Sequence, residues 1–573
     1  MITTAGTPTL KSQRLGSLPL INHFLDRLGL EAHLERFVPT IDRRIRLAYA
    51  KGLGVLVRSI LVEREPVYRQ QEMVNGFAAE CFGLTGEQAR HVGDDAIGRA
   101  LDRLFDADRA ALLTEVVVAA AESFGVALEE LHNDSTTIRL CGQYLSARGR
   151  SVRGKRGPFI TYGYSKDHRP DLKQLLFILT TSDDGGVPVQ FRCEAGNASD
   201  SRTHEQTWDA LCRAAGRVDF LYVADSKLCN REAMDHIDRR QGRFVTVMPR
   251  SRREDGQFRE WIQKHEPAWE LVWDRPNPRR GSGPRDRWWV FRSPVPSREG
   301  WTVIWVYSEL LALRQERTRQ GRLARAIERL QELNARLLGP RPRRRSRRKV
   351  RVFVEEILAE GHVSQYLNVR ILRHHEHYFK QAGPGRPGPN TRYVRKTHQR
   401  WRLEWKLNQT QVAYDHKSDG MYPLLTNDLE LTPAEVLKAH KRQPAIEKRF
   451  EQTKTVFEIA PVLLKNEGRV EALFFVYFLA LLVQALIERQ LRRAMQDNDI
   501  ESLPLYPEER RTKRPTAEQI FRLFTSTQRH ELQRRGRVVT TFEATLTDLQ
   551  AQVLSLLGVT RSAYTVAPRC KRP

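Results

Sequence analysis

The sequence predicts a mixed α/β protein in which one α/β region is interrupted by a long insertion. Apolar residues recur at helical spacing through residues 15–128, and strand patterns alternate with helical ones over residues 129–252. A strand followed by a helix returns within residues 419–500, whereas residues 253–418 read differently from both. With 573 residues, of which 40% are hydrophobic, the chain is long enough for several domains and a large core.

The chain is strongly basic, with 95 Lys and Arg against 69 Asp and Glu and a formal net charge of +26. A field of this sign attracts polyanions, so we expect nucleic acid as the partner, with an anionic membrane as the weaker alternative. The six cysteines form no Cys-x-x-Cys pair, which argues against a disulfide framework or a thiolate zinc site. This pattern fits a reducing, cytoplasmic compartment.

We expect no membrane association. Residues 1–20 lack the basic start and continuous apolar core of a signal peptide. The apolar run 472–487 is shorter than the roughly 18 residues that a spanning helix needs. It therefore predicts a helix buried inside a large domain.

Helical regions are expected at both ends of the chain, as an N-terminal domain over residues 1–128 and a basic C-terminal region over residues 501–573. The N-terminal apolar positions at helical spacing include Leu25, Leu28, Leu30, Leu34, Leu53, Leu56, Val57, Ile60, Leu61, Ile97, Leu101, Leu104, Phe105 and Leu112. In a basic chain such a domain suits binding of DNA ends. A packing or dimerisation domain fits the same pattern equally well.

Residues 129–252 are expected to form the first part of an α/β sheet. A hairpin signal at Ser182-Asp-Asp-Gly-Gly186 joins two β-rich runs. In the resulting order the first and fourth strands can lie side by side, which would bring Asp134 to Asp225. Beyond the strand around Asp134, the expected elements are strands over 175–181, 187–191, 220–224 and 244–248 and helices over 202–215 and 231–239.

The insertion, residues 253–418, carries paired aromatics on strand-like pieces. Trp288-Trp289-Val-Phe291 and Trp301-Thr-Val-Ile-Trp-Val-Tyr307 are the clearest of these, and residues 383–389 form a glycine- and proline-rich loop. Alternate tryptophans in strands usually belong to a core.

A charged helix is expected over residues 308–338 of the insertion. Its apolar positions keep a four-three rhythm in which Asn334 occupies one slot, over too short a length to establish a dimeric coiled coil. The rhythm consists of Leu323, Ile327, Leu330 and Leu337. The basic stretch 340–351 that follows is either a solvated segment or a contact to phosphate.

Residues 419–500 are expected to return to the α/β domain. An Asp-Gly turn leads into a strand over residues 421–426. A helix opens at Thr432, with proline at the first helical position and a capping-box glutamate three residues after the cap. Pro444 breaks or restarts this helix, which places Glu447 about one turn into the second piece.

Three carboxylates in different contexts could together hold two divalent metal ions. Asp134 lies in Leu131-His-Asn-Asp-Ser, Asp225 ends an apolar run, and Glu447 lies on the helical segment just described. Hard cations prefer oxygen ligands, and two such ions bring a nucleophile and a leaving oxygen to one phosphate. Taken singly, each residue reads as a turn, a helix cap or a solvated charge. Their combination in a basic chain indicates phosphodiester chemistry.

Short motifs around these carboxylates are specific enough to indicate a family. They are Asn133-Asp134-Ser-Thr-Thr137, Gly163-Tyr-Ser-Lys-Asp-His-Arg-Pro-Asp-Leu-Lys-Gln174, Gly196-Asn197-x-x-Asp200, Ala224-Asp225-Ser, Asp419-Gly-x-Tyr422 with Leu425-Thr-Asn427, and Ile446-Glu447-x-x-Phe450 with Lys454. Over residues 130–475 the chain thereby resembles the DDE transposases of bacterial insertion sequences. Within them it is most similar to the insertion-sequence-four group and its sixteen-thirty-four family.

The resemblance implies a ribonuclease H-like catalytic domain interrupted by a largely β insertion. It also implies that Asp134, Asp225 and Glu447 are the catalytic residues and hold two Mg²⁺ ions, for which Mn²⁺ can substitute. The expected partners are the terminal inverted repeats of the element and target DNA. A homodimer in a synaptic complex is the expected assembly.

The resemblance further implies which residues contact DNA. The family pattern Tyr-x2-Arg-x3-Glu-x6-Lys puts Lys454 on its Lys, but His440 on its Tyr and Gln443 on its Arg. His440 is expected to bind phosphate, and Lys441 or Arg442 to replace the missing guanidinium. By the same resemblance, Trp288 and Trp289 of the insertion are candidates for holding a flipped base.

Two other functions remain open at this point. A nuclease of the same fold would cut DNA without joining it. A catalytically inactive copy would bind DNA through its basic surface alone, and the departures at His440 and Gln443 favour that alternative.

Overall fold

The computed structural model describes most of the chain, which forms two compact units. Unit 1 comprises residues 1–247, 426–428 and 438–573, and unit 2 comprises residues 248–425 and 429–437. The residues described are 8–140, 144, 149, 151–163, 169, 171–198, 203–276, 283–339, 346–457, 459, 464, 466–534 and 537–565.

The sheet of unit 1 has the strand order β6-β5-β2-β7-β8. Its strands are β2 (Glu130–Leu140), β5 (Lys173–Ser182), β6 (Pro188–Ala195), β7 (Leu221–Ala224) and β8 (Arg243–Val247). β2, β5 and β6 pair antiparallel, whereas β7 pairs parallel with both β2 and β8. The predicted hairpin is confirmed, as is the predicted adjacency of the first and fourth strands. Gly185 and Gly186 adopt positive φ in the hairpin turn, where a side chain would be strained.

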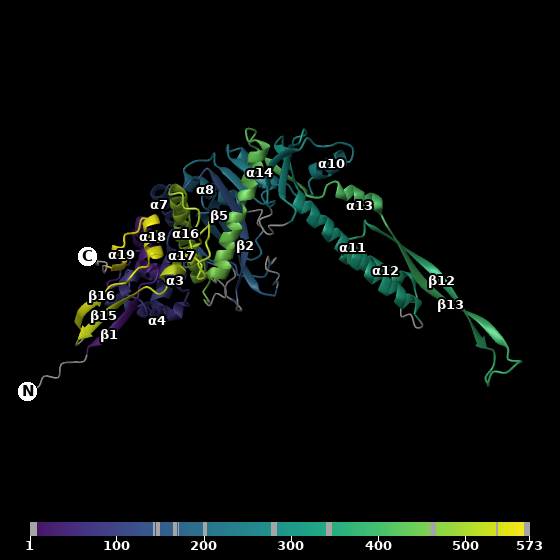
Figure 1. Ribbon diagram of the computed structural model, residues 1–573, viewed down its shortest axis with the longest axis horizontal. Coiled ribbons are helices and arrows are strands. Elements are labelled where there is room, and N and C mark those ends of the chain that lie inside the picture. The colour runs from purple at the N-terminus through teal and green to yellow at the C-terminus, as the bar shows by residue number, and fades with distance from the viewer. Residues whose placement is uncertain are drawn as a thin grey trace, which may run out of the picture. The chain divides into compact units, whose positions relative to one another are not determined.

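Helices cover this sheet within unit 1. The helices α8 (His204–Ala215) and α9 (Arg231–Asp238) lie at the predicted places between strands. The long helix α16 (Glu467–Asp497) packs on β6 and on helices of the N-terminal segment (Figure 1). Phe191 of β6 stacks on Phe478 of α16 with ring centroids 5.1 Å apart.

Helix α16 contains the apolar run noted in the sequence. Among the described residues it is the one helix long and apolar enough to cross a membrane. However, 94% of its most apolar window is buried inside the fold, as expected for a core helix.

The rest of unit 1 comes from both ends of the chain. Its helices are α1 (Leu18–Arg27), α2 (Leu30–Phe37), α3 (Tyr49–Val62), α4 (Gln70–Asn75), α5 (Gly86–Ala89), α6 (Asp94–Asp106), α7 (Arg109–Phe124), α17 (Ala517–Phe524), α18 (Asp548–Leu556) and α19 (Ser562–Thr565). A small antiparallel sheet joins β1 (Thr9–Arg14), β15 (Gln528–Arg534) and β16 (Arg537–Phe542), and a two-stranded ribbon joins β3 (Ser151–Val152) and β4 (Lys155–Arg156). The strands near the C-terminus differ from the helical region expected there, because the central strand β15 pairs with β1, which lies more than 500 residues away in sequence.

Unit 2 contains a second group of strands, in the order β14-β11-β10-β9. They are β9 (Glu270–Arg275), β10 (Asp286–Arg292), β11 (Thr302–Ser308) and β14 (Met421–Thr426), and α10 (Arg253–Trp261) and α13 (Gln409–His416) accompany them. The motif residue Asp419 forms a buried ion pair with Arg319, whose Nη1 lies 3.1 Å from Oδ1. Gly420 has φ +78°, and a Cβ there would lie 2.5 Å from the carbonyl oxygen of Ser308. The Asp-Gly turn is therefore held both by charge and by close packing.

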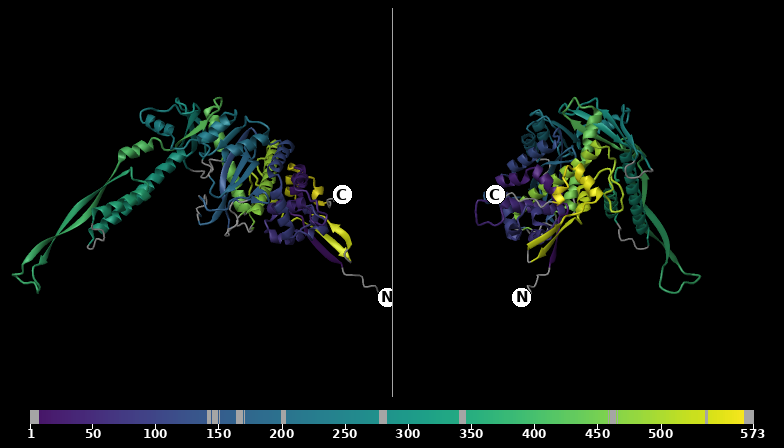
Figure 2. Two further views of the ribbon diagram at one scale, coloured as in Figure 1. Left: turned by 180° about the vertical axis from the view of Figure 1, so that it is seen from behind. Right: turned by 60° about the vertical axis from the view of Figure 1, so that its left-hand side comes forward.

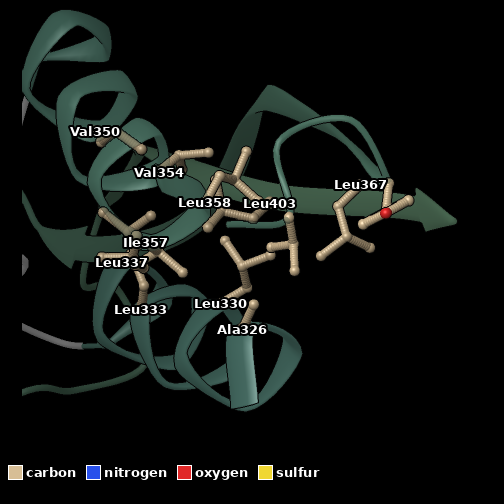
Figure 3. Packing of buried hydrophobic residues seen from close by; sticks show 12 residues of the cluster. Ala326, Leu330, Leu333, Leu337, Val350, Val354, Ile357, Leu358, Leu367 and Leu403 are labelled. Carbon is tan, nitrogen blue, oxygen red and sulfur yellow. The ribbon is translucent and has the colours of Figure 1, made fainter. Parts of the chain in front are cut away.

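The helices α11 (Glu309–Leu338) and α12 (Arg347–Glu360) share a hydrophobic core with the base of a long hairpin. Figure 3 shows this cluster, which includes Leu330, Leu333, Leu337, Val350, Val354, Ile357, Leu358, Leu367 and Leu403. The four-three rhythm of α11 thus finds its partners within the chain. Asn334 accepts a hydrogen bond from the backbone N–H of Leu403 at 2.8 Å, which explains a polar residue in that slot.

The hairpin consists of β12 (Leu367–Gln381) and β13 (Tyr393–Leu407), and residues 383–389 form part of its loop, as predicted. Both strands were missed in the sequence. Apolar residues alternate only at the base of the hairpin, as in Leu367-Asn-Val-Arg-Ile371, whereas most side chains further out are exposed on both faces. Helix α12 was also missed, because its start lies in the basic run that was interpreted as either a solvated segment or a contact to phosphate.

Candidate active site

Asp134 lies within strand β2 of the unit 1 sheet, opposite Leu179 of β5. Its Oδ1 accepts a hydrogen bond from the backbone N–H of Ser135 at 2.7 Å, and the residue is partly exposed. The neighbouring Asn133 is buried and donates through Nδ2 to Oγ1 of Thr180 at 2.9 Å. Successive strand residues face opposite sides of a sheet, so Asn133 ties β2 to β5 while Asp134 points to the other face.

Asp225 follows strand β7 directly. Its Oδ1 accepts a hydrogen bond from the backbone N–H of Lys227 at 2.9 Å, and its carbonyl oxygen accepts one from Oγ1 of Thr246 at 2.7 Å. The carboxylate therefore shapes the turn after β7, which is the structural role that a strand-end Asp commonly has.

The two aspartates occupy corresponding positions on neighbouring strands. β2 and β7 are parallel, and the last pair in register is Asn133 with Ala224. Asp134 and Asp225 each come one residue later, on strands that lie about 4.8 Å apart in a sheet. The strand adjacency predicted from the element order is thus confirmed.

The charge of Asp225 helps to keep the phenol of Tyr222 protonated. Burial, and then the charge of Asp225, raise the pKa of Tyr222 well above its ordinary value. The Tyr222 hydroxyl lies 3.0 Å from Nδ1 of His204. This phenol therefore stays protonated near neutral pH.

Glu447 lies in the first turn of helix α15 (Pro444–Glu451), as the proline pattern predicted. Its side chain is exposed, whereas Ile446 and Phe450 on the same helix are buried. The preceding helix α14 (Pro433–Arg442) opens with the predicted capping box, since Thr432 and Glu435 exchange hydrogen bonds. Helix α15 packs on β2 and β5, so Glu447 is carried by a helix that contacts the strand of Asp134.

A buried ion pair that the sequence did not reveal fixes α15. The Nη1 of Arg449 lies 2.8 Å from Oε2 of Glu488 on α16, and both side chains are almost fully buried. Arg449 also donates to the carbonyl oxygens of Gly185 and Gly186, each at 2.8 Å. The available signal was a charged residue among the apolar positions of each helix, because a buried charge requires a partner.

The residues expected to contact DNA lie at the end of α14 and beyond α15. Burial, with Lys441 and His132 nearby, lowers the pKa of the partly buried His440 to about 3. His440 is therefore neutral near neutral pH and presents no cation to a phosphate. Lys441 is likewise partly exposed, and Lys454 lies in a π-helical turn, η4 (Gln452–Val456).

Arg442 is exposed but already faces two carboxylates of the chain. Its Nη1 lies 3.2 Å from Oε2 of Glu130 and 3.2 Å from Oδ2 of Asp183. Burial and the charge of Glu130 raise the pKa of Asp183, although the Arg442 bond opposes this. These pairs hold the end of α14 at the start of β2.

Trp288 and Trp289 lie on β10 of unit 2 and are both partly exposed. Nε1 of Trp288 donates to Oδ1 of Asp286 at 2.6 Å, and the ring packs near Trp273. Trp289 lies near Tyr307, at a centroid distance of 5.2 Å. Both rings thus have structural neighbours within unit 2.

The donor atoms of the three carboxylates suit Mg²⁺ or Mn²⁺, since all are hard oxygens. Among the residues that the structure describes, no group of three or more His, Cys, Asp or Glu side chains could hold a metal ion. The structure places the strands of Asp134 and Asp225 side by side. A shared site that includes Glu447 stays a prediction.

Comparison with known families decides what kind of protein this is. A family described as "Transposase DDE domain" matches residues 129–483, which is more than half of the chain. The chain belongs to this DDE transposase family. A second family, "Domain of unknown function (DUF4277)", matches residues 10–118 of the transposase. No curated protein matches the chain.

Two glycines of the transposase motifs have a packing role. A Cβ on Gly163 would lie 1.9 Å from the carbonyl oxygen of Gly196, and a Cβ on Gly196 would lie 2.1 Å from that of Gln174. Nε2 of Gln174 donates to the Gly196 carbonyl at 2.8 Å. No other residue would fit at either glycine without moving the backbone. The remainder of the Gly163 block falls largely outside the described residues, as does Asp200.

Asn427, from another motif of the transposase, also serves packing in unit 1. Its Oδ1 accepts from the backbone N–H of Phe244 at 2.9 Å, and its Nδ2 donates to the carbonyl oxygen of Gly242 at 2.8 Å. The same amide nitrogen donates to Oδ1 of Asp238 at 2.8 Å. This side chain therefore ties α9 to β8.

Proposed function

We propose that this transposase binds the terminal inverted repeats of its insertion sequence, cleaves DNA there and transfers the freed strand to target DNA. We also propose that it belongs to the sixteen-thirty-four family of the insertion-sequence-four group and has a ribonuclease H-like catalytic domain. The observation that carries the proposal is the placement of Asp134 and Asp225 on paired parallel strands within the matched domain.

In this proposal Asp134, Asp225 and Glu447 hold two Mg²⁺ ions, for which Mn²⁺ can substitute. The ions, when bound, supply charge stabilisation at the phosphate and activation of the attacking oxygen. Asp225 would serve both its turn, through Oδ1, and the metal ions. Lys454 would neutralise a phosphate oxygen near the cut, and Lys441 would add a second cation beside the neutral His440.

The test is nicking of supercoiled plasmid that carries the ends of the element, with Mg²⁺ or Mn²⁺. Asp134→Asn, Asp225→Asn and Glu447→Gln should each reduce nicking at least about a hundredfold, since even partners of metal ligands contribute 10- to 100-fold. Binding of the DNA ends should persist. Glu451→Gln is the matched control, because Glu451 is also exposed and lies one turn further along α15. Nicking by any of the three variants at the parental rate would refute the assignment.

A catalytically inactive DNA-binding copy is the second candidate. It is favoured by His440 and Gln443, which depart from the family pattern, and by the neutral state of His440. If the parent protein binds end DNA but nicks with neither metal, this candidate replaces the first. Strand transfer from pre-cut ends separates a transposase from a nuclease.

A further inference from the structure

The hairpin of β12 and β13 extends well beyond the core that supports it. Its register is continuous from Leu367 opposite Leu407 to Gln381 opposite Tyr393. The base packs against α11 and α12 through residues such as Leu367 and Leu403, and beyond it Arg400 donates to the carbonyl oxygen of Leu338 at the end of α11. Both views of Figure 2 show the hairpin continuing past these two helices. We call its outer part, residues 374–400, the distal ribbon.

The distal ribbon is held mainly by contacts between its own two strands. Tyr378 stacks on His398 at 4.2 Å, and Nδ1 of His377 lies 2.8 Å from Oγ1 of Thr397. Most of its side chains on both faces are exposed. Because an isolated two-stranded hairpin is only marginally stable in water, such an arm gains from a partner that covers it.

The charge of the hairpin indicates what that partner is. Residues 367–407 contain ten Lys and Arg but only two Glu and no Asp. In the distal ribbon the cations are Lys380, Arg386, Arg392, Arg395, Lys396 and Arg400, against the single carboxylate of Glu376. Phe379 and Tyr393 near the tip are 68% and 53% exposed. Exposed cations interleaved with exposed aromatic rings suit a polyanion with stacked bases.

We propose that the distal ribbon is a DNA-binding arm that lies along duplex DNA. A two-stranded antiparallel ribbon fits the B-DNA major groove, which is about 12 Å wide. Strand residues 374–381 extend for about 26 Å, or roughly eight base pairs. This inference rests on the proposed function only in taking DNA as the substrate.

Two other readings of the ribbon account for less. Lysines on edge strands prevent aggregation, but a few charges suffice for that purpose, and here nearly every charge has one sign. Pairing with the ribbon of a second copy would bring two strongly positive surfaces together, which costs free energy at moderate salt. Duplex DNA is a polyanion and is therefore attracted by the positive charge of the ribbon.

The test compares three variants of the full-length protein. In the first, residues 374–400 are replaced by Asn-Gly, which closes a two-residue hairpin between the directly opposed Arg373 and Trp401. The second is Lys380→Gln with Arg395→Gln and Lys396→Gln. The control removes the same charge from exposed positions of α11, with Arg314→Gln, Arg317→Gln and Arg322→Gln. Circular dichroism checks that each variant keeps its fold.

The measurement is the Kd for a duplex of about 40 base pairs, by fluorescence anisotropy over a series of KCl concentrations. Each lost phosphate contact should weaken binding about eightfold at 0.1 M salt. We therefore expect the triple ribbon variant to bind at least tenfold more weakly, with a salt slope smaller by about two to three. The shortened variant should show at least this loss, and the α11 control should bind like the parent.

Equal Kd and salt slope for the parent and the two ribbon variants would overturn the inference. So would dissociation of a dimer on shortening, seen by sedimentation with DNA affinity unchanged, because the partner would then be a second copy. The outcome is separable from that of the proposed function. Plasmid nicking depends on the carboxylates, and loss of nicking in the parent leaves ribbon-dependent binding measurable.

Discussion

The buried pair of Arg449 and Glu488 should account for a large part of the stability around α15. Oε1 of Glu488 accepts from Nε2 of Gln452 at 2.9 Å and from the backbone N–H of Ala517 at 3.0 Å, while Oε2 accepts from Arg449. Glu488→Ala would leave the Arg449 guanidinium buried without its counter-charge. Glu488→Gln keeps the shape and removes only the charge.

The magnitude follows from how fully the pair is buried. The side chains of Arg449 and Glu488 are 3% and 1% exposed. Removing one partner of such a pair costs about 3–5 kcal/mol, because the other charge stays desolvated. We expect Glu488→Ala to lose about that much and Glu488→Gln roughly 2 kcal/mol. The double variant Arg449→Leu with Glu488→Leu should lose less than the sum of the single variants, since no charge then stays unpaired.

The pair also predicts a pH dependence. Burial opposes ionisation of Glu488, but the charges of Arg449 and Arg492 together with the hydrogen bonds from Ala517 and Arg449 hold the pKa of this carboxyl below its ordinary value. A carboxyl whose folded pKa is lowered stabilises the fold above its unfolded pKa. That contribution is lost as pH falls through the lowered folded value.

The assay must report on unit 1. Nine of the ten tryptophans lie in unit 2, so tryptophan fluorescence would follow the wrong unit, with Trp208 the exception. Hydrogen–deuterium exchange of peptides from α15 and α16 measures the opening free energy directly. Glu471→Gln on the same helix is the control. Its pair with Arg109 is 19% exposed on each side, and we expect a loss below about 1 kcal/mol.

A loss for Glu488→Ala no larger than that for Glu471→Gln would refute this reasoning. So would simple additivity in the double variant. Because Arg449 positions α15 without facing DNA, Glu488→Gln should lower the plasmid nicking rate while leaving the affinity for end DNA unchanged.

Two further predictions concern single polar side chains. Because burial lowers the pKa of His440 to about 3, the unfolded chain binds the extra proton between roughly pH 6.5 and 3. The free energy of unfolding should therefore decrease as pH drops through that window. Urea unfolding at pH 7.5 and 5 measures this decrease, and it should be smaller in His440→Gln. The same decrease in the variant and the parent would contradict the assignment. Asn334→Leu should destabilise unit 2 by about 1–3 kcal/mol, since the buried N–H of Leu403 loses its acceptor, and tryptophan fluorescence during urea unfolding measures this loss.

Local signals in the sequence sufficed wherever turn, capping or helix-breaking residues mark the ends of an element. The paired glycines gave the hairpin turn at Gly185, and Thr432 and Pro444 gave the start of one helix and the restart of the next. The ribbon of β12 and β13 carries only its glycine- and proline-rich loop as a local signal. Its outer part faces solvent on both sides, so apolar alternation and burial mark only the base, and its register appears only when Leu367 is seen opposite Leu407.

The same distinction applies to the candidate site. Asp134 and Asp225 could be brought together from the order of strands alone, because parallel pairing of the first and fourth strands fixes their positions. The place of Glu447 depends instead on how α15 is held, through Arg449, Glu488 and the carbonyl groups of the hairpin turn. Contacts of that kind link positions far apart in sequence, and no local pattern encodes them.

The motifs that identify the family therefore report on packing and on chemistry separately. Gly163 and Gly196 permit a close backbone approach, and Asn427 ties a helix to a strand, so these residues would be needed even in a copy that cuts nothing. Asp225 also serves its own turn through Oδ1. A match to the family thus reports on the fold of the domain, whereas the proposed activity depends on the carboxylates of Asp134, Asp225 and Glu447. The substitutions Asp134→Asn and Asp225→Asn separate packing from chemistry. These variants should keep the fold and the DNA binding, whereas nicking should stop.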